Sequence, residues 1–203
     1  MRLPALVLAM VATALLLGGS QAQAAGIQTE GSQVWPGKLQ VGFHPLGGQV
    51  SWNLNSVGGY KIVADVAGLI AQPGPVSLWL GGGINYTAGL YYCYTGFGVG
   101  LGTSCGHDIQ FWAFVMVTLE KLITKIPLVP FVRAGLAGDV LVFSRLGGAF
   151  ALRFGGGVHY WLLKNIGLGI ETNFTIGPAI GGPWNGTTLY GTWDFGIGAR
   201  FAF

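Results

Sequence analysis

The sequence predicts an all-β protein, an eight-stranded antiparallel up-and-down transmembrane β-barrel. Three observations predict this fold class. The chain is 51% hydrophobic and only 8% charged. Beyond the first twenty residues it has no continuous apolar run of the roughly 18 residues that a membrane-spanning helix needs. Apolar residues instead alternate with small or polar ones, as in strands. Because only helices and closed barrels satisfy their backbone hydrogen bonds within lipid, a barrel is the remaining architecture.

Residues 1–24 have the pattern of a cleaved secretory signal peptide. Arg2 gives a basic start, residues 5–17 form an apolar core, and residues 22–24, Ala-Gln-Ala, match a small-residue cleavage site. The alternative, a retained membrane anchor, is less favoured because the apolar core is short. We therefore expect an exported protein in which residues 25–203 form one barrel domain.

Two cysteines follow in the exported part of the chain. Cys93 and Cys105 enclose a stretch rich in tyrosine and glycine, which is typical of a loop. Cysteines of exported chains meet an oxidising compartment and pair there, so two free buried thiols are the less favoured alternative. We expect a structural disulfide that restrains this loop.

Eight segments with a period of two are separated by turn residues. Most reach the roughly 9 to 11 residues that a tilted strand needs to cross a bilayer. The expected strands are 38–45, 59–70, 75–87, 108–120, 127–143, 149–163, 165–177 and 187–203. The expected connections are tight at 71–75, 121–127 and 163–165, long at 46–58, 88–107 and 178–186, and short at 144–148. Short turns on one side and long loops on the other are typical of outer-membrane barrels, with both termini on the periplasmic side.

The charged residues of these strands share one parity with the small residues, and the opposite parity is bulky and uncharged. The charged residues are Lys38, Lys61, Asp65, Asp108, Glu120, Arg133, Asp139, Arg153, Glu171, Asp194 and Arg200. A soluble barrel would show the same alternation with inside and outside exchanged. However, the bulky face has more volume than an eight-stranded lumen can hold. So few charges would also cover the outside of a soluble barrel thinly. We therefore expect the bulky face to contact lipid.

The charges of the other face then line the lumen, where they need partners. With Asp108 set aside near the outer rim, we expect a nearly neutral interior. The expected cations are Lys38, Lys61, Arg133, Arg153 and Arg200, and the expected anions are Asp65, Glu120, Asp139, Glu171 and Asp194.

A simple hairpin register places some of these residues together. If Phe143 pairs with Ala149, then Asp139 lies opposite Arg153, and Arg133 lies opposite His159. The tight turn that follows brings Glu171 beside His159 or one pair away. We expect a network whose members are Arg133, Asp139, Arg153, His159 and Glu171. It either fills and specifies the core, which we favour, or gates a narrow polar path.

The last strand ends in GIGARFAF, with Phe201 and Phe203 on its apolar side. This segment resembles the C-terminal signal by which bacterial outer-membrane barrels are recognised for insertion. With PFVRAGLAGDVLVF and FGGGVHYWLLKNIGLGIETNFTIGP, the mature chain resembles the small eight-stranded OmpA/OmpX-like barrels. The resemblance implies a monomer in the bacterial outer membrane. Its expected partners are outer-membrane lipid, lipopolysaccharide, the barrel assembly machinery and periplasmic chaperones.

The expected function is that of an integral outer-membrane barrel with a structural or narrow-pore role. The alternative is a surface adhesion or binding barrel that acts through its external loops. These loops are rich in aromatic residues, namely Tyr91, Tyr92, Tyr94 and Phe97.

A lipid A-modifying enzyme is a minor alternative. Ser77 and His159 share the lumen parity, but no compact His-x-Ser pattern occurs, so we predict no catalytic residue. We also predict no metal site and no cofactor, because His44, His107 and His159 are far apart in the sequence. The net charge of +3 is too small to indicate nucleic-acid binding.

Overall fold

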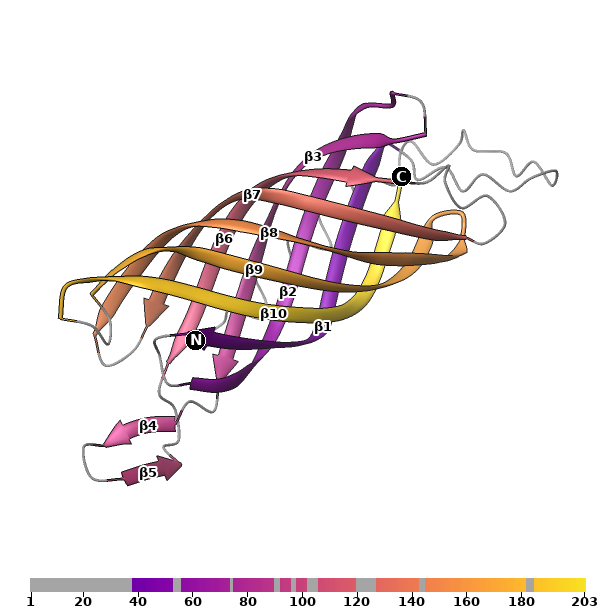
Figure 1. The fold of residues 1–203 in the computed structure, drawn as a ribbon. Coiled ribbons are helices and arrows are strands. Elements are labelled where there is room, and N and C mark those ends of the chain that lie inside the picture. Colours follow the sequence, from indigo (N-terminus) through magenta and orange to yellow (C-terminus); the bar gives the residue numbers. More distant parts are fainter. Residues whose placement is uncertain are drawn as a thin grey trace.

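The computed structural model describes residues 38–52, 56–73, 75–89, 92–95, 98–101, 106–119, 127–142, 145–181 and 185–203. Eight strands form a closed antiparallel barrel in the order β1-β10-β9-β8-β7-β6-β3-β2 (Figure 1). Neighbours in the barrel are neighbours along the chain, and β1 closes the ring against β10. The predicted fold class is therefore confirmed. In this part of the chain, no helix has the length and hydropathy needed to cross a membrane.

The barrel strands are between 12 and 18 residues long. They are β1 (Leu39–Trp52), β2 (Ser56–Ala71), β3 (Ser77–Gly89), β6 (His107–Thr118), β7 (Leu128–Val142), β8 (Leu146–Leu163), β9 (Ile166–Gly181) and β10 (Thr187–Ala202). Two short strands, β4 (Tyr92–Thr95) and β5 (Gly98–Leu101), pair only with each other. Figure 1 shows this hairpin beyond the end of the barrel opposite the C-terminus.

One of the predicted long loops is wrong and another is shorter than expected, because the strands continue into them. Most of 46–58 belongs to β1 and β2, whereas β9 includes only the first part of 178–186, up to Gly181. The first strand was expected to span 38–45, and its last residue, Pro45, would ordinarily interrupt a strand ladder. The structure accommodates it at a register shift between Phe43 and Leu46. Of the connections at this end of the barrel, only the one that carries β4 and β5 is long.

The last strand is fixed to the first up to the final residue. Leu39 N donates to Phe203 O (3.1 Å), and Phe203 N donates to Leu39 O (2.8 Å). Val41 is paired with Phe201 in the same ladder. The C-terminal aromatic residue therefore completes the seam that closes the barrel.

Burial separates the two faces of the wall as the sequence predicts. Bulky residues such as Leu152 and Ile170 point outward and are each 60% exposed. The buried residues point inward and include both aromatic and charged side chains, among them Trp79, Trp112 and Arg200. This distribution is the reverse of a soluble protein, in which charges face outward and bulky apolar side chains are buried.

Candidate functional site in the lumen

The barrel interior holds nine buried charged side chains among the described residues, each at most 4% exposed. They come from six strands and are Lys61, Asp65, Asp108, Arg133, Asp139, Arg153, Glu171, Asp194 and Arg200. A charge in such an environment is stable only with a partner of opposite charge or several hydrogen bonds. The contacts divide these residues into three groups.

The inner cluster consists of Asp65, Arg133, Glu171 and Arg200, near the end of the barrel that carries the C-terminus. Arg200 Nη2 donates to both oxygens of Asp65 at 2.8 and 3.0 Å. Arg133 Nη2 donates to Glu171 Oε1 (2.6 Å), and Arg133 Nη1 lies 3.5 Å from Asp65 Oδ2. Two guanidinium groups therefore neutralise two carboxylates.

The central cluster consists of Lys61, Arg153 and Asp194. Lys61 Nζ lies 2.8 Å from Asp194 Oδ2, and Arg153 contacts both oxygens of the same carboxylate at 2.9 and 3.1 Å. Asn173 Nδ2 also donates to Asp194 Oδ1 (3.0 Å). One carboxylate thus serves two cations, which leaves this cluster with an excess positive charge.

The outer acid pair consists of Asp108 and Asp139. Gln49 Nε2 and Tyr190 Oη donate to Asp108 Oδ2 at 3.0 and 3.1 Å. Gln110 Nε2 donates to Asp139 Oδ1 (2.6 Å). In the part of the chain that the structure describes, neither carboxylate has an ion pair. The side chains that donate hydrogen bonds to these two carboxylates, Gln49, Tyr190 and Gln110, are all neutral.

Aromatic side chains fill the space around the cations. The guanidinium carbons of Arg133 and Arg153 lie 4.2 and 4.8 Å from the centre of the Trp112 ring. The Arg133 guanidinium carbon is also 5.7 Å from the Phe114 ring centre. These distances fit cation–π attraction, which is strongest where the cation has lost its water. Trp112 therefore links the inner and central clusters and occupies the middle of the lumen.

The predicted register of the β7–β8 hairpin is wrong. Val142 pairs with Leu146, so the turn is tighter than a pairing of Phe143 with Ala149 would make it. Consequently Asp139 lies opposite Ala149, and Arg153 lies opposite Gly135.

Of the two other predicted neighbours of His159, Arg133 is misplaced and Glu171 is confirmed. Arg133 lies opposite Gly155 and not His159. Glu171 does lie one pair away from His159, because His159 pairs with Gly169 and Gly157 with Glu171.

The structure also places individual residues outside the predicted network. His159 stacks on Phe131 with ring centres 4.3 Å apart, and its Nε2 atom has no hydrogen-bond partner among the described residues. Lys38 is exposed at the barrel end and is not a lumen cation. Asp108 was left out of the predicted lumen charges because it was expected near the outer rim, but it is only 2% exposed and belongs to the buried lumen charges. Glu120 lies outside the described residues.

Several lumen residues escaped the sequence reasoning, which followed charges. Gln110, Trp112 and Asn173 share the parity of the charged residues on their strands, and that parity could have identified them. Gln49 fell in a segment expected to be a loop. These residues supply many of the neutral donors and acceptors that connect the charged groups.

His44, Asp65 and Glu171 form a group of possible metal ligands that the sequence analysis did not anticipate. One ligand atom from each lies within 4.8 Å of the others, and His44 Nδ1 is 3.6 Å from Glu171 Oε2. However, the guanidinium groups of Arg133 and Arg200 already contact both carboxylates. The negative charge that would attract a cation is therefore neutralised.

The residues considered for lipid chemistry have other contacts. Ser77 Oγ accepts a hydrogen bond from Gln72 Nε2 (3.3 Å), and His159 packs against Phe131 and Trp161. The predicted signal peptide lies outside the described residues. So does the predicted disulfide, because Cys105 and the side chain of Cys93 are not described.

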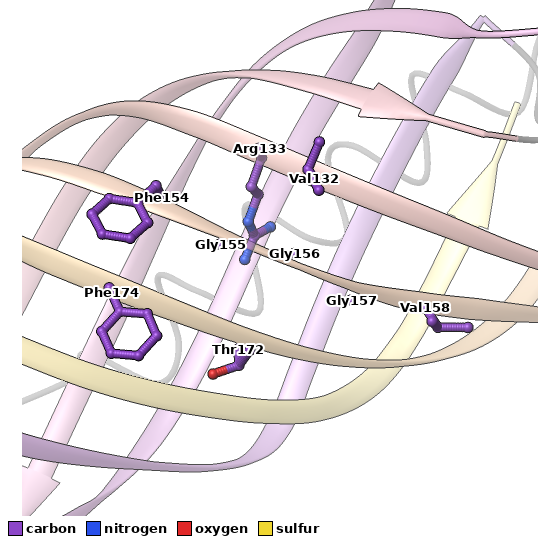
Figure 2. A pocket seen from close by; sticks show the side chains of 9 residues that line it. All are labelled: Val132, Arg133, Phe154, Gly155, Gly156, Gly157, Val158, Thr172 and Phe174. Carbon is purple, nitrogen blue, oxygen red and sulfur yellow. The ribbon is translucent and has the colours of Figure 1, made fainter.

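The wall of the barrel is thin beside the inner cluster. An open hollow of about 600 Å³ lies on the wall and is bordered by Phe154, Phe174 and Val132. Figure 2 shows these side chains from close by. Residues 155–157, three consecutive glycines, form its floor, and Arg133 extends behind them. Because residues 155–157 have no side chains, Arg133 itself belongs to the lining of the hollow.

A closed barrel with a bulky apolar exterior and a polar, charge-paired interior is a transmembrane β-barrel. No protein-family model matches the sequence, and no curated protein is detectably similar to it. The fold is similar to the crystal structure of Neisserial surface protein A, with a TM-score of 0.52 and 16% identity, over 81% of this chain and 95% of that chain. It is also similar to the outer membrane protein AlkL in lipid bilayers, with a TM-score of 0.51 and 12% identity, over 90% and 94% of the two chains. The chain thus has the fold of the small eight-stranded outer-membrane barrels.

Proposed function

We propose that the protein is a structural barrel of the bacterial outer membrane whose lumen is closed in its resting state. The observation that carries this proposal is the burial of the interior. Arg153, Asp194 and Trp112, which come from three strands, are at most 5% exposed to water. A water-filled pore would leave polar lumen side chains accessible, as in larger porins. The interior therefore stabilises the barrel, and a narrow path would require the clusters to separate.

The membrane part of the proposal is supported by the exterior. Outward-facing aliphatic and aromatic residues occur on every barrel strand, and in water such a surface would drive aggregation. In lipid the same surface is the favourable one. We further propose that the barrel is a monomer in contact with outer-membrane lipid and lipopolysaccharide. Periplasmic chaperones and the barrel assembly machinery would deliver it there.

Single-channel conductance of the refolded protein in a planar bilayer tests the closed lumen. We expect no openings from the wild-type barrel, with heat-modifiable gel mobility to demonstrate that it is folded. Trp112→Ala should produce discrete openings, because it removes the side chain between Arg133 and Arg153. Phe154→Ala is the matched control, since Phe154 points outward and its loss leaves the lumen filled. Openings of the wild type that change in an Arg153 variant would replace the structural role with a gated pore.

The hairpin of β4 and β5 favours a second candidate function, recognition at the cell surface. It forms a two-stranded sheet of its own and extends beyond the barrel end opposite the C-terminus (Figure 1). Such a projection can reach a partner without disturbing the barrel. Replacing residues 90–106 with a short turn should leave folding intact and abolish cell attachment by bacteria that display the protein. Unchanged attachment would exclude this role.

A further inference from the structure

The buried lumen charges in the described part of the chain do not balance. Among the described residues, five buried carboxylates face four buried cations. The inner cluster of Asp65, Arg133, Glu171 and Arg200 is neutral by itself. The central cluster has an excess of one positive charge, and the outer acid pair has two negative charges. One negative charge is therefore left without compensation, and it lies in the outer half of the lumen.

The two acids share one location. Gln110 pairs with Asp139 between β6 and β7, and Asp108 is two residues away from Gln110 on the same strand. Asp108 and Asp139 are therefore diagonal neighbours on the lumen face of the β6–β7 ladder, where side chains are within reach of each other. Both side chains are at least nine-tenths buried, and Asp108 Oδ1 and Asp139 Oδ2 have no hydrogen-bond partner in the described part of the structure. Two buried carboxylates on one lumen face, each with an oxygen that lacks a donor, are the arrangement that a cation completes.

Among the described residues, the neighbouring elements bring no cation into direct contact with this pair. Gln49 on β1 and Tyr190 on β10 donate neutral hydrogen bonds to Asp108. Lys61 on β2 and Arg153 on β8 act on the pair electrostatically, but both are in direct contact with Asp194. Their charge is thus shared with another carboxylate.

The other group of possible ligands gives a useful contrast. His44, Asp65 and Glu171 are closer to a familiar metal site in residue type, yet Arg133 and Arg200 already occupy oxygens of both carboxylates. A divalent ion there would be repelled by two guanidinium groups at short range. The charge distribution therefore favours Asp108 and Asp139 as the cation site. This pair offers fewer ligands than the group of His44, Asp65 and Glu171, but its negative charge is not neutralised by an arginine in direct contact.

We propose that Asp108 and Asp139 form a binding site for one cation at the outer end of the lumen. The occupant is a proton shared by the two carboxyl groups or a small metal ion held by their free oxygens. Either one supplies the missing positive charge and links β6 to β7 where the two strands reach the outer end of the barrel. The site is independent of whether the lumen conducts.

Thermal unfolding of the purified protein in lipid vesicles, followed by heat-modifiable gel mobility, tests this site. The first comparison adds Ca²⁺ at neutral pH to wild type and to Asp139→Asn, with NaCl at equal ionic strength as the reference. A metal ion as occupant raises the unfolding midpoint of the wild type by at least about 2 °C and leaves the variant unchanged. The variant needs no cation, because the amide that Asp139→Asn introduces supplies a donor and removes the unpaired charge.

The second comparison varies pH in the presence of EDTA. A shared proton as occupant makes the wild-type midpoint fall as the pH rises, because deprotonation leaves two facing carboxylates, while Asp139→Asn stays constant. Asp108→Asn is the second variant if Asp139→Asn does not refold. Thr175→Val is the matched lumen control, since it alters a neutral contact of Arg153 and should keep the wild-type responses. Identical responses of wild type and both amide variants to Ca²⁺ and to pH would overturn the proposal.

Discussion

Arg153 and Asp194 form two parallel hydrogen bonds across the lumen, from Nη1 to Oδ2 (2.9 Å) and from Nη2 to Oδ1 (3.1 Å). Arg153 belongs to β8 and Asp194 to β10, and β9 lies between these strands in the barrel. Asn173 of β9 donates to the same carboxylate (3.0 Å). The two-point geometry is the strongest form of an arginine–carboxylate contact. It connects strands that share no backbone hydrogen bonds.

The first prediction concerns this ion pair. Arg153→Met should lower the free energy of unfolding by about 3 kcal/mol, because Asp194 stays buried and loses one of its two cations. Urea unfolding of the refolded protein, followed by tryptophan fluorescence, measures the change. Arg145→Met is the control, since Arg145 is exposed and contacts only Asn185 among its assigned side-chain partners. An equal loss in both variants would show that the lumen contact contributes nothing beyond a surface arginine.

The second prediction uses the space at two glycines. A methyl group on Gly42 would lie 2.8 Å from both Arg200 Nη2 and Asp65 Oδ2, whereas one on Gly138 meets nothing within 4 Å. Gly42→Ala should therefore separate the Arg200–Asp65 pair and cost about 1–3 kcal/mol. Gly138→Ala should be neutral or slightly stabilising. The two unfolding free energies, measured side by side, check the claim, and equal values would contradict it.

The two-residue period was sufficient to predict the barrel and the orientation of its faces. Charges at positions such as Lys61, Asp65 and Arg153 shared one parity. The volume of the opposite face and the small number of charges decided which side that parity occupies. The number of strands followed from the turn residues between the periodic segments. Residue alternation and turn residues are properties of short segments, so they can be recognised in the sequence without knowledge of the three-dimensional structure.

The partners of each charge were less predictable, because they depend on register and on contacts across the lumen. A hairpin only slightly tighter than expected moved Asp139 away from Arg153. Lys61 and Asp194 are joined through the lumen, although β1 lies between their strands. No pattern along one strand contains that information. The end of the first strand was also missed, because β1 continues past Pro45 to Trp52.

The third prediction compares the cost of an outward-facing arginine at two depths in the membrane. Leu152 lies in the middle part of β8 and Leu146 at its outer end, and both point outward with 60% and 72% exposure. Leu152→Arg should cost about 2–4 kcal/mol when the barrel is folded in lipid, and Leu146→Arg at most about 1 kcal/mol. The difference arises because only the central position is far from water and headgroups. Equilibrium refolding into vesicles measures both values. Equal costs at the two depths would contradict a membrane-spanning orientation.

The fourth prediction concerns the seam between the first and last strands. Deleting Phe203 removes two backbone hydrogen bonds with Leu39, each worth about 0.5–1.5 kcal/mol, together with the terminal aromatic side chain. We expect a smaller fraction of heat-modifiable, folded barrel after refolding into vesicles.

Phe203→Leu separates the two contributions, because it keeps both backbone bonds and an apolar side chain. If the seam is what matters, Phe203→Leu refolds like the wild type and only the deletion fails. If both variants refold normally in pure lipid yet fail to insert in cells, the aromatic terminus acts as a recognition signal for the assembly machinery. Normal insertion of the deletion variant in cells, with full heat-modifiability, would contradict both roles of the terminal residue.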